Sequence, residues 1–156
     1  MKKLRVYLDT SVFGGCFDEE FAAESKQLFT EIMSGFFEVV VSRTTLDELN
    51  RAPERVQKIL ADIPEEFVEF FDAGDEADKL ATAYLEAGIL GKSSMGDAEH
   101  IAAASLAEVD FVVSWNFKHI VHYDKIRAYQ AVNMLKGYKP ILIYSPKEVV
   151  EYDSED

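Results

Sequence analysis

The chain has 156 residues, of which 48% are hydrophobic, and it carries a formal net charge of -13 at pH 7. This length fits one domain with a hydrophobic core of its own. The apolar runs are only a few residues long, which excludes a transmembrane helix. The strong negative charge disfavours unselective binding to nucleic acid.

The first residues and the cysteine content bear on the cellular compartment. A basic start at Lys2 and Lys3 leads into an apolar stretch, as in a secretion signal, but Asp9 interrupts that stretch too early. Cys16 is the only cysteine, so it has no partner for an internal disulfide. Both features predict a protein of the reducing cytoplasm.

The charge is distributed unevenly along the chain. Residues 54–86 contain ten acidic and three basic residues, whereas residues 118–147 contain six basic residues and one acidic residue. Residues 148–156 contain five acidic residues and no basic one. We therefore expect one domain over residues 1–147, followed by an acidic tail over residues 148–156. The basic segment either meets an anionic substrate or forms a solvated helix face.

The predicted elements of the first part of the chain alternate between strand and helix. A buried strand over residues 4–8 precedes a helix over residues 20–34, which ends at a glycine. A strongly apolar strand over residues 36–41 precedes a helix that contains TTLDELN and is capped by Ser42 or Thr44. Another helix follows over residues 54–62.

The same alternation continues in the second part. The predicted elements are, in order, a strand over residues 67–71, helices over 75–87 and 97–108, a strand over 110–114, a helix over 120–135 and a strand over 140–144. This order predicts an α/β protein whose mostly parallel sheet is covered by helices on both faces.

Four polar residues lie where such a sheet forms its ligand site, beyond the carboxyl ends of the strands. Asp9 follows the strand VYL, Glu48 lies in the helix after FFEVVV, Asp97 begins the helix after GKSSMG, and Asn116 follows FVVSW. Carboxylates gathered in one cleft repel one another unless a cation neutralises them. Mg²⁺ or Mn²⁺ with oxygen ligands does so, and such an ion also activates water for attack on a phosphodiester.

Each acid also has a purely structural interpretation. Asp97 can be the N-cap of its helix, and Glu48 can be a first-turn acid favoured by the helix dipole. Asp9 is the hardest to explain in this way, because it directly follows a buried strand and precedes Thr10 and Ser11.

Four motifs follow one another along the chain: YLDTSVF, TTLDELN, GDAEHIAAA and DFVVSWNFKHI. In this order and spacing they resemble the PIN-domain family, in its VapC-like branch of toxin ribonucleases, over essentially the whole chain. The resemblance implies a three-layer α/β/α sandwich around a mostly parallel sheet. It also implies a metal-dependent endoribonuclease that uses Mg²⁺ or Mn²⁺, with RNA as substrate and an antitoxin protein as a possible partner.

The resemblance assigns the family's metal-binding acids to Asp9, Glu48 and Asp97. The fourth catalytic position of the family is often Asp in a T-x-D pattern, and here Ser114 and Asn116 occupy that pattern. An amide contributes less to metal affinity than a carboxylate, so whether the site takes one ion or two stays open.

Several neighbouring side chains are candidates for contact with the substrate. Thr10 and Ser11 adjoin Asp9, Ser114 precedes Asn116, and Lys118 opens the basic segment. His100 and His119 each lie three residues after a site residue and can bind phosphate or transfer a proton. A histidine packed at the rim of the cleft explains each of them more simply, and His122 is expected at the surface.

Two rival enzyme classes fit the sequence less well. A phosphatase of the haloacid dehalogenase type needs a second acid two residues after the first, where this chain has Ser11. The GKSS segment at residues 91–94 lacks the strand and the leading glycine of a phosphate-binding loop. A PIN-like domain that has lost catalysis and serves as a binding or scaffold module remains the alternative, favoured by Asn116 and the acidic surface.

The aromatic content bears on assembly. Six aromatic residues exceed what a small core hides readily: Phe67, Phe70, Phe71, Tyr84, Tyr129 and Tyr138. We therefore expect a homodimer.

Overall fold

The computed structural model describes residues 2–152 and contains one five-stranded sheet. Its strands stand in the order β3-β2-β1-β4-β5, and every neighbouring pair is parallel. The strands are β1 (Leu4–Leu8), β2 (Phe37–Val41), β3 (Val68–Phe70), β4 (Phe111–Val113) and β5 (Ile143–Tyr144). The mostly parallel sheet predicted from the sequence is confirmed.

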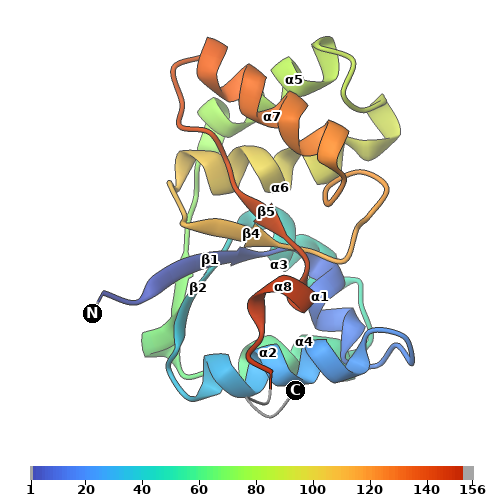
Figure 1. Cartoon of the computed structure of the whole chain (residues 1–156), viewed down its shortest axis with the longest axis vertical. Helices are drawn as coiled ribbons and strands as arrows, with labels where there is room; N and C mark the ends of the chain where they lie inside the picture. Colours follow the sequence, from blue (N-terminus) through green and yellow to red (C-terminus); the bar gives the residue numbers. More distant parts are fainter. Residues whose placement is uncertain (1, 153–156) are drawn as a thin grey trace.

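Helices cover both faces of this sheet (Figure 1). On one face lie α2 (Ala22–Met33), α4 (Glu54–Ala61) and α8 (Pro146–Val149). On the other face lie α5 (Gly74–Glu86), α6 (Met95–Leu106) and α7 (Tyr123–Leu135). The α/β/α sandwich implied by the family resemblance is confirmed.

The alternation of side chains along each strand divides the core into two clusters. Val6 and Leu8 of β1 pack toward α2, whereas Tyr7 between them packs toward α6. In β4, Val112 packs into the same cluster as Tyr7, and Val113 packs into the same cluster as Val6 and Leu8. A strand buried on both faces must be apolar throughout, which is why these segments were recognisable in the sequence.

The helices differ from the prediction at three places. Residues 10–15 form a short helix, α1 (Thr10–Gly15), directly after β1. The helix expected to begin at residue 120 begins at Tyr123, because Ile120 and Val121 donate backbone hydrogen bonds to the Asn116 carbonyl and His122 forms the N-cap. The last helix, α8, was not expected; its N-cap Ser145 and its residue Glu148 form a capping box.

The end of the domain and the acidic tail meet in α8. This helix contains residue 148, where the tail was expected to start, and it packs against α2 with Val150 buried behind it. Residues 153–156 of the predicted tail lie outside the described part of the chain.

Two of the six aromatic residues that suggested a homodimer belong to the core. Tyr84 and Tyr129 are fully buried and pack edge to face with ring centroids 4.9 Å apart. Phe70 is exposed, and Phe67, Phe71 and Tyr138 are partly exposed. None of the helices in residues 2–152 is long and apolar enough to cross a membrane.

Candidate active site

The strand order reverses between β1 and β4, and this position is where open parallel sheets bind ligands. The chain runs from β1 to its neighbour β2 and on to β3, and later enters β4 on the other side of β1. Asp9 directly follows β1, and Ser114 directly follows β4. The two residues therefore meet at the carboxyl edge of the sheet.

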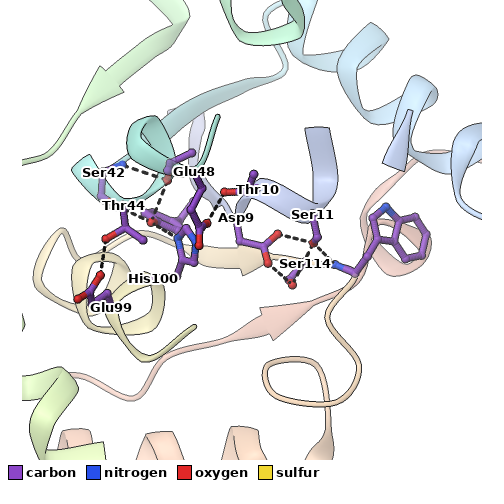
Figure 2. A network of polar contacts seen from close by, with 12 residues as sticks. Asp9, Thr10, Ser11, Ser42, Thr44, Glu48, Glu99, His100 and Ser114 are labelled. Carbon is purple, nitrogen blue, oxygen red and sulfur yellow. Dashed lines mark hydrogen bonds and ion pairs between the residues drawn. The ribbon is translucent and has the colours of Figure 1, made fainter. Parts of the chain in front are cut away.

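Asp9 is 3% exposed and is held by two hydroxyl groups. Ser11 Oγ donates to Asp9 Oδ1 at 2.6 Å, and Ser114 Oγ donates to Asp9 Oδ2 at 2.7 Å (Figure 2). Asp9 occupies the N-cap position of α1, but its side chain makes no capping hydrogen bond. Burial raises the pKa of Asp9, and the charge of Asp97 adds to this rise, while His100 and the two hydroxyls oppose it.

Glu48 is held by a second network on the other side of Asp9 (Figure 2). Glu48 belongs to α3 (Arg43–Asn50), and its Oε1 atom lies 2.5 Å from Thr10 Oγ1 and 2.6 Å from His100 Nε2. Because Glu48 is the sixth residue of α3, the interpretation of it as a first-turn acid is wrong. The helix is capped by Ser42, one of the two predicted caps.

His100 connects Glu48 to β1. Its Nδ1 atom lies 2.7 Å from the hydroxyl of Tyr7, which in turn lies 2.8 Å from Ser42 Oγ and 3.1 Å from Thr45 Oγ1. His100 is 2% exposed, so it is a core histidine rather than a residue of the cleft rim. Ser114 and His100, both predicted as possible contacts for the substrate, are buried and hold the carboxylates of Asp9 and Glu48.

The protonation of this pair follows from its surroundings. Burial acts to lower the pKa of His100, but Tyr7, Glu48 and Asp9 outweigh it and raise that pKa well above 6.5. Burial acts to raise the pKa of Glu48, but the hydrogen bond and charge of His100 and the Thr10 hydroxyl bring it below its ordinary value. The two shifts agree in favouring a buried imidazolium beside a carboxylate.

Asp97 lies in the first turn of α6, after the N-cap Ser94. The interpretation of Asp97 as the N-cap is therefore wrong. Its carboxylate is half-buried, and burial raises its pKa, against the opposing effects of His100, His119 and a hydrogen bond from Asn116. Just before it, Gly96 lies against Glu48, since a Cβ atom there would be 3.2 Å from Glu48 Oε2.

The loop after β4 places the remaining candidates. Asn116 Oδ1 accepts a hydrogen bond from the His119 backbone N–H at 2.9 Å. His119 is partly exposed, and its Nδ1 atom is buried without a hydrogen-bond partner among the described residues. Lys118 is exposed.

The fit of a metal ion to these residues is partial. Within residues 2–152, no group of three or more His, Cys, Asp or Glu side chains is placed to hold an ion together. Glu48 Oε1 is engaged by Thr10 and His100, both oxygens of Asp9 accept hydroxyl hydrogen bonds, and the charge of Asp97 raises the pKa of Asp9. Mg²⁺ is commonly held by one or two carboxylates, with water and substrate phosphates as its other ligands. In that mode of binding, Asp9 and Asp97 would be the two carboxylates.

Sequence reasoning did not find the roles of Tyr7, Thr45 and Trp115, or the contact between the predicted cap Ser42 and Tyr7. Tyr7 carries a hydroxyl into a strand that is otherwise apolar, which is the signal that a buried polar partner must face it. Trp115 lies between Ser114 and Asn116, and its backbone N–H donates to Ser11 Oγ at 2.9 Å.

Comparison with solved structures finds similar folds. The chain is similar to a chain of VapBC2 from Rickettsia felis bound to a DNA fragment from its promoter, with 15% identity, coverage of 91% and 98% of the two chains, and a TM-score of 0.54. A chain of FitAB bound to the IR36 DNA fragment matches with 15% identity, coverage of 95% and 99%, and a TM-score of 0.54. FitAcB from Neisseria gonorrhoeae matches with 14% identity, coverage of 91% and 98%, and a TM-score of 0.50.

Sequence comparison gives no match to a protein-family profile and none to a curated protein. At 14–15% identity the structural similarity concerns the fold. Over nearly its whole length, the chain therefore has the PIN-like fold that its sequence motifs predicted.

Proposed function

We propose that this protein is a metal-dependent endoribonuclease that hydrolyses RNA phosphodiesters at the Asp9 edge of the sheet. The observation that supports the proposal is that Asp9, at the switch between β1 and β4, and Asp97, in the first turn of α6, both have a raised pKa, and that the charge of Asp97 contributes to the rise at Asp9. A divalent cation would offset the cost of keeping these two acids charged.

The residues around the two acids have defined tasks in this proposal. Ser11 and Ser114 orient Asp9, and Asn116 acts to lower the pKa of Asp97. Glu48, whose Oε1 atom is held by Thr10 and His100, would help to hold the ion directly or through water. When bound, Mg²⁺ or Mn²⁺ would polarise the phosphodiester and lower the pKa of a water molecule. The family resemblance implies products with a 5′-phosphate and a 3′-hydroxyl.

The proposal extends to partners. The similar structures are those of VapBC and FitAB toxin–antitoxin assemblies, some of them bound to DNA. By analogy, this chain is the toxin of a type II pair, with RNA as substrate, an antitoxin protein as inhibitor and the cytoplasm as its compartment. A short reading frame beside the gene would encode the antitoxin.

A second function is favoured by two observations. No three-ligand metal group is assembled within the described residues, and Asn116 replaces the acid often found at its position. A PIN-like domain that has lost catalysis and acts as a binding or scaffold module also fits these findings. Its thermal stability would not respond to Mn²⁺, whereas a metal-binding nuclease gains stability from the ion.

The test is cleavage of a mixed RNA pool by the purified chain with Mn²⁺ or Mg²⁺, and with EDTA as control. The proposal predicts cleavage with either metal, none with EDTA, and 5′-phosphate ends that a 5′-phosphate-dependent exonuclease can degrade. Cleavage that persists in EDTA would contradict the metal dependence, and its absence in every condition would favour the scaffold.

A further inference from the structure

Phe117 presents an aromatic ring at the edge of the candidate site. It directly follows Asn116 in the loop after β4, and it is 44% exposed. A partly exposed ring beside a nucleic-acid site offers a flat face on which a base can stack. Such a contact requires that other side chains hold the ring in a fixed place and orientation.

The ring is held in place by two other aromatic residues. Its centroid lies 6.0 Å from that of Trp115, edge to face, and 6.2 Å from that of Phe21. Trp115 stacks on Phe21 at 4.2 Å, and its indole N–H donates to Ser25 Oγ at 2.8 Å. Because the Phe117 backbone N–H also donates to the Trp115 carbonyl at 2.9 Å, the ring is oriented before any ligand arrives.

The same support connects the ring to the acids. The Trp115 backbone N–H donates to Ser11 Oγ at 2.9 Å, and Ser11 donates to Asp9 at 2.6 Å. On its other side, Phe117 adjoins Asn116, whose backbone N–H donates to Ser114 Oγ at 2.9 Å, and Ser114 donates to Asp9 at 2.7 Å. The ring thus extends directly from the loop that shapes the catalytic edge.

The basic side chains that follow Phe117 in the sequence favour contact with a nucleic acid. Lys118 is exposed, and together with His122 and Lys125 it lines a hollow of about 420 Å³. Asp124 also lines this hollow, and Lys125 already donates to the Ile89 carbonyl. In a chain of net charge -13, the exposed Lys118, which directly follows Phe117 in the sequence, favours a phosphodiester backbone over another acidic surface.

We propose that Phe117 is a stacking platform for an unpaired base of the RNA, next to the phosphate that is cleaved at Asp9 and Asp97. The inference rests on the proposed function for the identity of the substrate. It assigns Phe117 to binding and positioning of the RNA, with Lys118 as the neighbouring contact to phosphate. In a duplex the faces of a base are covered by the neighbouring base pairs, so the contact selects single-stranded over double-stranded RNA.

The test measures binding in EDTA, where metal-dependent cleavage does not occur. The probes are a fluorescein-labelled single-stranded RNA of mixed sequence and the same strand annealed to its complement. Phe117→Leu keeps an apolar side chain against Phe21 and Trp115 but removes the aromatic face. Loss of one stacked base lowers affinity by about 5- to 150-fold. We expect a loss of that size for the single strand, little change for the duplex, and recovery in Phe117→Tyr.

Two control variants separate stacking from other effects. Phe36 is 59% exposed and precedes β2, at the opposite edge of the sheet, so Phe36→Leu should not change the affinity. Lys118→Gln should reduce the slope of log affinity against log salt by about one unit, whereas Phe117→Leu should leave that slope unchanged. Melting temperatures close to the wild-type value show that each variant is folded.

The outcomes separate this inference from the proposed function. Equal affinity of wild type and Phe117→Leu for the single strand overturns the inference, even if the wild type cleaves RNA, and assigns the ring to a protein surface. Equal weakening for single strand and duplex overturns it as well, because stacking is not then the contact. A selective loss in a protein that cleaves no RNA supports the stacking platform and contradicts the nuclease.

Discussion

The Nε2 atom of His100 lies 2.6 Å from Glu48 Oε1, so a fully buried side chain of α6 fixes a carboxylate of α3. This contact joins two of the four sequence motifs, and the hydroxyl of Tyr7 extends it to the first strand. The buried imidazole supplies positive charge to an edge that otherwise gathers carboxylates. Its protonation therefore bears on the stability of the metal-free protein.

The first prediction concerns pH. The native pKa of His100 is raised above 6.5, so between pH 6.5 and that raised value the native protein holds a proton that the unfolded chain has released. The free energy of unfolding therefore falls as pH rises through this window. The pKa values of Asp9 and Asp97 are raised above 3.8. Their titration therefore also lowers the free energy of unfolding as pH rises, in a window that begins at pH 3.8.

Thermal melting in EDTA between pH 5 and pH 9 checks this. We expect the melting temperature to fall above pH 6.5 in the wild type and to fall less in His100→Gln, which has no proton to lose. A wild-type melting temperature that rises over this range would show that His100 is neutral in the folded protein.

The second prediction uses a pair of adjacent glycines. A Cβ atom on Gly15 would lie 2.5 Å from Ser25 Oγ and 2.7 Å from Trp115 Nε1, whereas one on Gly14 would meet nothing within 4 Å. Gly15→Ala should therefore lower the free energy of unfolding by about 1–3 kcal/mol, as overpacking does. Gly14→Ala should leave stability unchanged or raise it slightly, since alanine favours the helix.

Urea denaturation of the two variants measures the difference. The fluorescence of Trp115, the only tryptophan of the chain, provides a local signal, and Gly15→Ala should alter it. Equal stability of the two variants would mean that Trp115 and Ser25 do not hold the close packing described here.

The third prediction concerns Asn116. Replacing it by Asp adds a negative charge beside Asp97 and keeps an oxygen that can accept the His119 N–H. Asn116→Asp should tighten Mn²⁺ binding in calorimetry, because ligand charge raises the affinity for a hard cation. Asn116→Ala removes the acceptor of the His119 N–H, so it should lower apo stability by about 0.5–1.5 kcal/mol. It should also slow cleavage by about ten- to a hundredfold, the usual cost of losing a partner of a metal ligand.

A matched control is available for this charge. Asn50 is exposed at the end of α3, and Asn50→Asp should leave Mn²⁺ affinity unchanged. If Asn116→Asp binds Mn²⁺ no more tightly than the wild type, Asn116 does not face the ion.

The fourth prediction is the homodimer. With Tyr84 and Tyr129 in the core, the aromatic argument depends on the residues that stay exposed, among them Phe70. Light scattering at high micromolar concentration should give the mass of two chains. A mass of one chain, 17.6 kDa, at that concentration would contradict the prediction.

The sequence predicted the fold well because its local signals were strong. The central strands are buried on both faces, so Val6 to Leu8 and Val39 to Val41 form apolar runs that only a parallel sheet explains. α1 was missed because its residues Gly14 and Gly15 are poor helix formers. α8 was missed because four residues are too few for a periodic pattern.

The site could be predicted only in part. Asp9 was identified because a carboxylate after a buried strand has few structural uses. The role of His100 could not be foreseen, since Tyr7 lies 93 residues away from it and Glu48 52 residues away. Only the folded chain shows that Ser114 is buried and donates a hydrogen bond to Asp9.

Asp97 is the residue on which the proposed metal-dependent cleavage depends most, since it is expected to bind the metal ion directly together with Asp9. Asp97→Asn removes one of the two repelling charges, so the apo protein should be as stable as the wild type or more stable. It should also lose the stabilisation by Mn²⁺, which for the wild type is about 2.7 kcal/mol at a hundred times the dissociation constant. Loss of the several kcal/mol that a metal ion supplies corresponds to a hundredfold or greater loss of rate.

The most direct measurement therefore compares wild type, Asp97→Asn and the control Asp47→Asn, an exposed acid of α3, in one experiment with Mn²⁺. Melting temperature and RNA cleavage are recorded with and without the ion. We predict that Mn²⁺ stabilises the wild type and Asp47→Asn, that both cleave RNA, and that Asp97→Asn shows neither response. Full cleavage and full stabilisation by Mn²⁺ in Asp97→Asn would place the metal site elsewhere and contradict the account.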